Sequence, residues 1–286
     1  MNANDFNTPV PNTWCPGCTN FMILAAVKKA MADLVNEGAC KKEQFTCVAG
    51  IGCHAKIYDY FDINGFYGLH GRVPPVMAGI RLANPNLKVL GFSGDGDALA
   101  EGMAHFIHFC RYNLDATYLL HNNQIFALTT GQVTPTSEPG AVAKSTPHGS
   151  PFRPINPVVL ALESGATFVA REYALDLQNL TATLKRAMKH KGAALVEILQ
   201  PCITFKDVRE FVKDKMYRIE PSDLEGALKN ARSWNYTKED SIRIPVGVFY
   251  ETQYPTLEEK VGVKVWHEAY PERPQRSTEE LWERFK

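Results

Sequence analysis

The 286-residue sequence predicts an α/β fold: a doubly wound, mostly parallel β-sheet followed by a C-terminal arm. Three observations carry this prediction. Short and almost wholly apolar runs recur along the chain, as expected of strands buried on both faces. Stretches with apolar residues at helical spacing separate several of these runs. Polar side chains follow the runs directly, where the loops at the carboxyl edge of a parallel sheet begin.

The predicted elements alternate in type over the first two thirds of the chain. They are a helix at 19–36, strands at 45–51 and 88–92, a helical stretch at 99–110, strands at 116–120 and 166–170, a helix at 176–190 and a strand at 194–199. Alternation of this kind favours parallel strands in one sheet. We therefore predict one domain over 1–205. The remainder, 206–286, is expected to be an extension that packs on a partner subunit, with an isolated strand at 244–250.

Charge and composition exclude several classes of partner. Lys plus Arg and Asp plus Glu number 31 each, so no net field attracts nucleic acid or an anionic membrane. The first residues lack the basic and apolar regions of a signal peptide, and no apolar run approaches the roughly 18 residues that cross a bilayer. We expect a cytoplasmic protein. Without a secretory signal, the seven cysteines indicate thiols or metal ligands more than disulfides.

The segment 131–158 interrupts the alternation, because it is rich in Gly, Pro, Ser and Thr. A long loop of this composition either lies over a functional site, settles on a partner or forms a surface excursion. The sequence leaves these three possibilities open.

Four candidate ligands come directly after predicted strands: Cys53, Asp95, Asn123 and Cys202. Because the carboxyl ends of parallel strands meet at one edge of a sheet, we expect all four to share one rim.

The sharpest motif is Gly94-Asp95-Gly96-Asp97, with an Asn-Asn pair ending at Asn123 after the next strand. Mg²⁺ prefers oxygen ligands in near-octahedral geometry, and a carboxylate with an amide oxygen supplies two of them. The glycines let the backbone approach a phosphate and bend into a helix whose N-terminus favours anions. Together the two motifs resemble the thiamin-diphosphate signature, in which Mg²⁺ neutralises the diphosphate.

The second constellation is a CxxC turn, Cys15-Pro16-Gly17-Cys18. A turn of this kind suits a zinc knuckle, a redox dithiol or an iron-sulfur cluster. A redox dithiol is expected after a strand, whereas this turn follows an irregular polar segment. Structural zinc does not explain why further cysteines lie at the predicted rim. An iron-sulfur cluster near a cofactor explains their position there.

Placement separates the other five cysteines. Cys47 lies inside an apolar strand and Cys110 among the apolar residues of a helix, so both are expected in the core. Cys40 lies at a helix end and is expected to be exposed. Cys53 and Cys202 remain as the two cysteines at strand ends.

Six motifs in order resemble one family, the β subunits of the 2-oxoacid:ferredoxin oxidoreductases. They are WCPGC, GIGCHAK, LHGR, SGDGDALAEG, HNNQIFALTTGQ and TPTS, and the resemblance covers about residues 12–205. It implies the thiamin-diphosphate-binding fold.

The resemblance also implies a set of ligands. A four-iron four-sulfur (4Fe-4S) cluster would be bound by Cys15, Cys18, Cys53 and Cys202. Mg²⁺ would be bound by Asp95, Asn123 and the carbonyl of Ile125. Thiamin diphosphate would be contacted by Ile51, Gly52, Cys53, His54, Gly94, Gly96, Asp97, Ala127 and Leu128.

Several charged residues near these motifs are further candidates. Lys56 matches a lysine that the family places near the substrate, where its charge would hold a 2-oxoacid carboxylate. The alternative is a solvated lysine. His70 and Arg72 are candidates for cofactor or substrate contacts. His121 either makes such a contact or is a packed histidine beside the loop that carries Asn123.

The family's activity is oxidative decarboxylation of a 2-oxoacid with coenzyme A, which gives acyl-CoA and CO₂ and sends electrons through the cluster to ferredoxin. The resemblance implies an α subunit as partner, carrying the glutamate that activates the cofactor. Pyruvate, 2-oxoglutarate and branched-chain oxoacids stay open as substrates, with 2-oxoglutarate or broad specificity favoured. The alternative is a non-redox thiamin-dependent decarboxylase or synthase subunit with structural zinc. A phosphate-binding scaffold is disfavoured, because no Walker lysine follows a Gly-rich loop.

Overall fold

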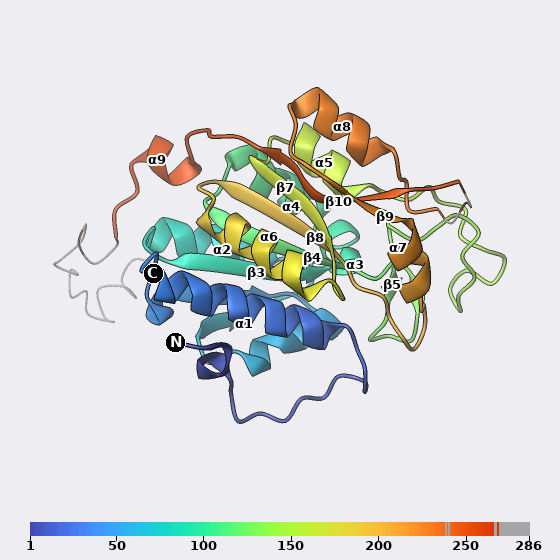
Figure 1. Cartoon of the computed structure of the whole chain (residues 1–286), viewed down its shortest axis with the longest axis horizontal. Helices are drawn as coiled ribbons and strands as arrows, with labels where there is room; N and C mark the ends of the chain where they lie inside the picture. Colours follow the sequence, from blue (N-terminus) through green and yellow to red (C-terminus); the bar gives the residue numbers. More distant parts are fainter. Residues whose placement is uncertain (238, 240, 266–267, 269–286) are drawn as a thin grey trace, which may run out of the picture.

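The computed structural model describes residues 1–237, 239, 241–265 and 268. In this part of the chain an eight-stranded sheet has the order β2-β1-β3-β4-β8-β7-β10-β9 (Figure 1). Its strands are β1 (Phe45–Ala49), β2 (Asn64–Tyr67), β3 (Lys88–Gly94), β4 (Ala116–Asn122), β7 (Phe168–Tyr173), β8 (Ala193–Leu199), β9 (Met216–Ile219) and β10 (Ile244–Glu251). The strands from β2 to β7 in this order pair in parallel, which confirms the mostly parallel sheet.

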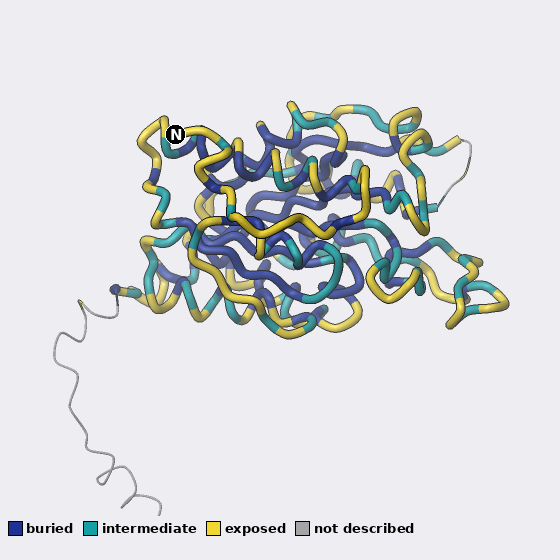
Figure 2. Tube along the Cα trace, turned by 90° about the horizontal axis from the view of Figure 1, so that it is seen from below, coloured by how far each residue is buried: buried dark blue, intermediate teal, exposed yellow. Residues whose placement is uncertain are grey.

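Helices cover both faces of the sheet, as a doubly wound fold requires. One face carries α1 (Asn20–Asn36) and α6 (Leu177–Lys189), and the other carries α2 (Val73–Ala83), α4 (Met103–Tyr112), α5 (Pro157–Glu163) and α8 (Leu224–Arg232). Side chains alternate between the two cores along each strand, so that Val196 packs under α1 and α6 while Leu195 packs on the opposite side. Figure 2 shows buried stretches of chain, in dark blue, through the centre of the molecule. Strands β1, β4, β7 and β8 consist wholly of buried residues.

The strand predicted at 244–250 is present as β10, but it is not isolated. It pairs antiparallel with β7 and parallel with β9, and Phe249 lies in the core on the α4 side. The physical reason is that the edge of β7 would otherwise leave its backbone N–H and C=O groups unpaired, and the apolar strand β10 pairs with them. The division of the chain at residue 205 stays a prediction, with two strands of the second part inside the sheet of the first.

Shorter elements fill the connections. They are 3₁₀ helices at Ala3–Phe6, Lys42–Gln44 and Cys53–Tyr60, helices α3 (Asp95–Leu99), α7 (Arg209–Lys215) and α9 (Leu257–Val261), and a separate two-stranded ribbon of β5 (Ile125–Phe126) and β6 (Gln132–Val133). Among the residues that the structure describes, no helix combines the length and apolar character needed to span a membrane.

The loop predicted at 131–158 has two different halves. Near its start Thr134, Thr136 and Ser137 are buried beneath the carboxyl edge of the sheet. Further along, Val142 and Phe152 are 74% and 70% exposed. The first half therefore packs against the rim of the sheet, and the second half is a surface excursion.

Candidate active site

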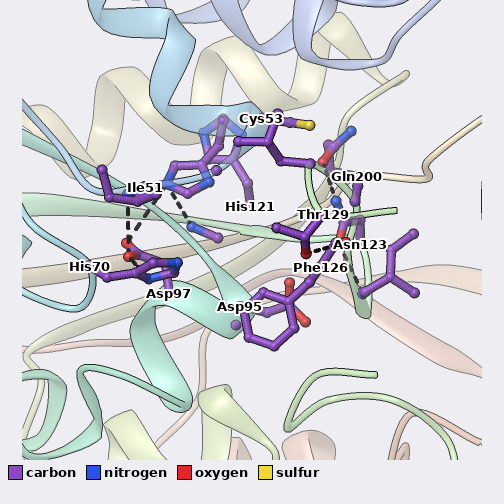
Figure 3. A pocket seen from close by; sticks show the side chains of 17 residues that line it. Ile51, Cys53, His70, Asp95, Asp97, His121, Asn123, Phe126, Thr129 and Gln200 are labelled. Carbon is purple, nitrogen blue, oxygen red and sulfur yellow. Dashed lines mark hydrogen bonds and ion pairs between the residues drawn. The ribbon is translucent and has the colours of Figure 1, made fainter. Parts of the chain in front are cut away.

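A cavity of about 60 Å³ lies at the carboxyl edge of β1, β3 and β4, and we call it the rim cavity (Figure 3). Its lining includes every residue predicted to contact the cofactor: Ile51, Gly52, Cys53, His54, Gly94, Gly96, Asp97, Ala127 and Leu128. The lining also includes the three predicted Mg²⁺ ligands, Asp95, Asn123 and Ile125. Parallel strands thus bring segments far apart in sequence to one place, as expected.

Asp95 is the buried carboxylate of the rim cavity. It is 1% exposed, and its Oδ2 accepts hydrogen bonds from the hydroxyls of Thr134 (2.6 Å) and Thr136 (2.5 Å). Burial raises the pKa of Asp95 to about 6, while the two hydroxyls act in the opposite direction. Sequence reasoning gave these threonines no role, although the TPTS motif that contains them was the available signal. They hold one oxygen of the carboxylate in a fixed place.

Asn123 is fixed by its neighbours at the end of β4. Its Oδ1 accepts from the backbone N–H of Ile125 at 3.0 Å, and its Nδ2 donates to Gln200 Oε1 at 3.2 Å. The first contact is a local side-chain to backbone turn of the kind that asparagine favours. Gln200, at the end of β8, is a lining residue that the sequence did not predict.

Asp97 holds two loops together. Its Oδ1 accepts from the backbone N–H groups of Gly71 (2.8 Å) and Ile51 (3.3 Å), and it lies 2.7 Å from His70 Nδ1. A Cβ on Gly50 would lie 1.9 Å from Asp97 Oδ2, so this position requires glycine. Although Asp97 lines the cavity, its described contacts serve to orient the predicted cofactor contact Ile51.

His54 and Gly94 pack closely at the end of β3. His54 Nε2 accepts from the backbone N–H of Gly94 at 3.0 Å, and burial lowers the pKa of His54 well below its usual range. The ring is therefore neutral and carries its proton on Nδ1. A Cβ on Gly96 would lie 2.3 Å from the ring of Phe126, so glycine at this position leaves room for that ring.

A second cavity, of about 190 Å³, adjoins the first, and we call it the cysteine cavity. Its lining includes all four predicted cluster ligands, Cys15, Cys18, Cys53 and Cys202. The CxxC turn is closed by a hydrogen bond from Cys18 N–H to the Cys15 carbonyl at 3.0 Å. Burial raises the pKa of Cys53 to about 11, and nearby Cys18 and Cys202 contribute in the same direction.

The remaining cysteines lie away from this cavity. Cys47 and Cys110 are buried in the two cores, which confirms their prediction. The prediction for Cys40 is wrong: it is 8% exposed, because the chain after α1 folds back into the apolar cluster beneath that helix. Within the described residues, no three His, Cys, Asp or Glu side chains gather closely enough to bind a single metal ion.

Lys56 lines the cysteine cavity and not the rim cavity. Its Nζ lies 3.3 Å from the Thr13 carbonyl, and its charge opposes the rise in the pKa of Cys53. A substrate role for Lys56 stays a prediction. His70 lines the rim cavity, whereas Arg72 donates to the Glu101 carbonyl at 2.7 Å and braces a loop.

A buried ion pair lies behind the end of β4, where Asn122 and Asn123 are found. Arg171 Nε donates to Glu197 Oε2 at 2.6 Å, and both side chains are fully buried. Glu197 Oε1 accepts from Tyr236 OH and Asn122 Nδ2, each at 2.7 Å. Tyr236 comes from the segment between α8 and β10, so the network joins the C-terminal part of the chain to the residue next to Asn123.

The two cavities share one wall, formed by Cys53, Asn123, Ala127, Leu128 and Gln200. A group bound in the rim cavity therefore contacts the same residues as a group bound among the cysteines.

Comparison with known proteins defines the class first. Residues 50–198 match the family described as thiamine pyrophosphate enzyme, C-terminal TPP binding domain. The fold is thus that of a thiamin-diphosphate-binding enzyme domain.

The relatives then define the family. The chain is 44% identical over 262 residues to 2-oxoacid:ferredoxin oxidoreductase 1, subunit beta, of Aeropyrum pernix, covering 86% of this chain and 79% of the relative. It is 45% identical over 205 residues to the 2-oxoglutarate oxidoreductase subunit KorB of Mycobacterium tuberculosis, covering 72% of this chain and 54% of that one. A solved 2-oxoglutarate:ferredoxin oxidoreductase of Magnetococcus marinus, with 2-oxoglutarate, coenzyme A and succinyl-CoA bound, matches with a TM-score of 0.84 and 34% identity, over 100% of this chain and 96% of that chain.

The chain belongs to the β subunits of the 2-oxoacid:ferredoxin oxidoreductases. It is an oxidoreductase subunit that works with an α subunit.

Proposed function

We propose that this subunit binds thiamin diphosphate with Mg²⁺ in the rim cavity and a 4Fe-4S cluster in the cysteine cavity. Together with its α subunit it oxidatively decarboxylates a 2-oxoacid with coenzyme A, giving acyl-CoA, CO₂ and two electrons that pass to ferredoxin. Residues 206–286 contact the α subunit in addition to extending the sheet. The complex acts in the cytoplasm.

The donor set of the rim cavity supports Mg²⁺. Asp95 is a buried carboxylate with a raised pKa, and a bound cation would offset the cost of ionising it there. Asn123 and the Ile125 carbonyl offer neutral oxygens on the same lining. One carboxylate with neutral oxygens, completed by phosphate and water, is a typical Mg²⁺ environment.

The cysteine cavity supports a cluster over a single ion. Four thiols line one cavity, and each nearby thiol makes ionisation of Cys53 harder. Iron shared among the thiolates would compensate that repulsion. A single zinc ion needs its sulfurs at about 2.3 Å from one centre, whereas a cluster holds them further apart.

The shared wall is the observation that carries the proposal. Thiamin diphosphate held in the rim cavity would supply an electron sink for decarboxylation, and a cluster held by the four cysteines would supply a one-electron acceptor. Cys53 and Asn123 contact both cavities, so donor and acceptor would lie side by side. Asp97 contributes by fixing Ile51, and the neutral His54 accepts a hydrogen bond from the backbone N–H of Gly94. Lys56 places a cation near the cysteine cavity for a carboxylate.

The test uses the αβ complex, purified without oxygen. Iron, acid-labile sulfide, zinc and thiamin are measured first, and reduction of ferredoxin is then followed with coenzyme A and a panel of 2-oxoacids. We expect iron and sulfide in equal amounts, no stoichiometric zinc, and ferredoxin reduction with at least one oxoacid, 2-oxoglutarate first. Decarboxylation without ferredoxin reduction, in a complex that contains zinc, would establish the non-redox alternative.

A further inference from the structure

Two buried polar atoms without partners flank the wall between the cavities. Asn20 Nδ2 and His121 Nε2 have no hydrogen-bond partner among the described residues. The other ends of the two side chains bond to each other, since His121 Nδ1 lies 2.9 Å from Asn20 Oδ1. An unpaired buried polar atom costs about 1–3 kcal/mol, so two of them in one hydrogen-bonded pair require an explanation.

The pair crosses from one cavity to the other. Asn20 is the first residue of α1, is fully buried and lines the cysteine cavity. His121, near the end of β4, is 1% exposed and lines the rim cavity (Figure 3). Each unpartnered atom therefore belongs to a residue at the edge of a different proposed binding site.

Asn20 also lies beside a cysteine. It follows Cys18 by two residues, and both residues line the cysteine cavity. The unpartnered Nδ2 of Asn20 is therefore a buried donor at the cavity that holds the Cys18 sulfur. Since Asn20 Oδ1 is taken by His121, the amide nitrogen is the end that is left for the sulfur, and a thiolate would repel the oxygen.

We propose that Asn20 is a positioning residue for the cluster: its Nδ2 donates a hydrogen bond to the metal-bound sulfur of Cys18, and His121 holds the amide in that orientation from the rim cavity. The proposal rests on the proposed function, because it requires the cluster. A metal-bound thiolate would satisfy the donor that the free thiol leaves unpaired.

The consequence is electrochemical. A hydrogen bond to a cluster sulfur stabilises the reduced cluster more than the oxidised one, because the reduced cluster is more negative. Asn20 therefore raises the reduction potential. His121 makes that effect depend on a side chain of the rim cavity, so the cofactor site and the cluster are linked through two residues.

The test is an EPR-monitored redox titration of the αβ complex carrying Asn20→Ala or Asn20→Asp. The Asp variant keeps the side-chain volume and loses the donor. We expect both to retain iron and sulfide and to have a lower reduction potential, by about tenfold in the equilibrium constant, or ~59 mV for one electron. His121→Phe removes the partner of Asn20 and is expected to lower the potential as well.

Asn156→Ala is the matched control. Asn156 also lies at a helix start with side-chain hydrogen bonds, to Ala231 and Trp234, and it lines neither cavity. Its potential is expected to equal that of the wild type. An unchanged reduction potential in the Asn20 variants would overturn this inference and leave the proposed function standing. Loss of iron from both variants would do the same, because the inference gives Asn20 no part in retaining the cluster. A wild-type complex without iron and sulfide would overturn the proposed function too.

Discussion

Replacing Tyr236 with Phe removes a single hydroxyl from the buried network of Arg171 and Glu197 behind the end of β4. Tyr236 is 1% exposed, its OH donates to Glu197 Oε1 at 2.7 Å, and it accepts from Arg171 Nη2 at 2.8 Å. Hydrogen bonds that involve charged groups contribute about 1.5–3 kcal/mol each, and the two are not additive. Because Arg171 keeps its direct bond to Glu197, no charge is left isolated. We expect a loss of about 2–3 kcal/mol of unfolding free energy.

Urea unfolding, followed by circular dichroism, measures this change. With a urea m-value of about 3 kcal/mol/M, the midpoint would fall by roughly 0.7–1 M. Tyr254→Phe is the matched control, because Tyr254 is 62% exposed and the change is expected to stay within about 0.5 kcal/mol. Equal midpoints for the two variants would refute the idea that this network anchors the C-terminal segment to the sheet.

The other predictions concern the two cavities. Asp95→Ala should abolish thiamin diphosphate binding, measured by calorimetry, while the iron content stays intact; unchanged affinity would mean that the Gly-Asp-Gly is only a turn. Cys53→Ala should lower iron and sulfide content, whereas Cys47→Ala, in the core, should not; the reverse pattern would show that the wrong sulfur was chosen. Folding raises the pKa of Asp95 from 3.8 to about 6, so the folded cofactor-free chain binds this proton more tightly than the unfolded chain. As the pH rises from 3.8 to about 6, this carboxyl therefore lowers the free energy of unfolding. Asp95→Asn should therefore stabilise the cofactor-free chain by up to about 3 kcal/mol at neutral pH and little at about pH 4, and equal stability at neutral pH would contradict this.

The parallel sheet and its rim could be predicted because each depends on a local pattern. Strands β3, β4 and β8 are covered on both faces, so they read as apolar runs, and the ligands follow directly where each strand ends. Strand β2 gave no such signal, because it is only four residues long and all four are exposed. The partners of β10 were not predictable either, because pairing at a sheet edge depends on which strands are already in place.

Side chains that support the site were harder to predict than side chains that form it. Thr134 and Thr136 lie in a loop of low hydrophobicity, and only the folded chain brings their hydroxyls to Asp95. The proposed role of Asn20 likewise depends on its hydrogen bond with His121, which lies 101 residues away in sequence. Cys40 was misjudged because a position beside two lysines does not reveal how the chain turns after α1.

The common wall of the two cavities limits how this subunit can be re-engineered. The rim cavity is lined by three consecutive residues, Ile51, Gly52 and Cys53, and the last of them also lines the cysteine cavity. An insertion of one residue there would shift the contacts on both sides together. A designer who wished to move the proposed cluster-binding loops onto another thiamin enzyme would have to transfer the turns after β1, β4 and β8 as one unit, with the CxxC segment that completes them.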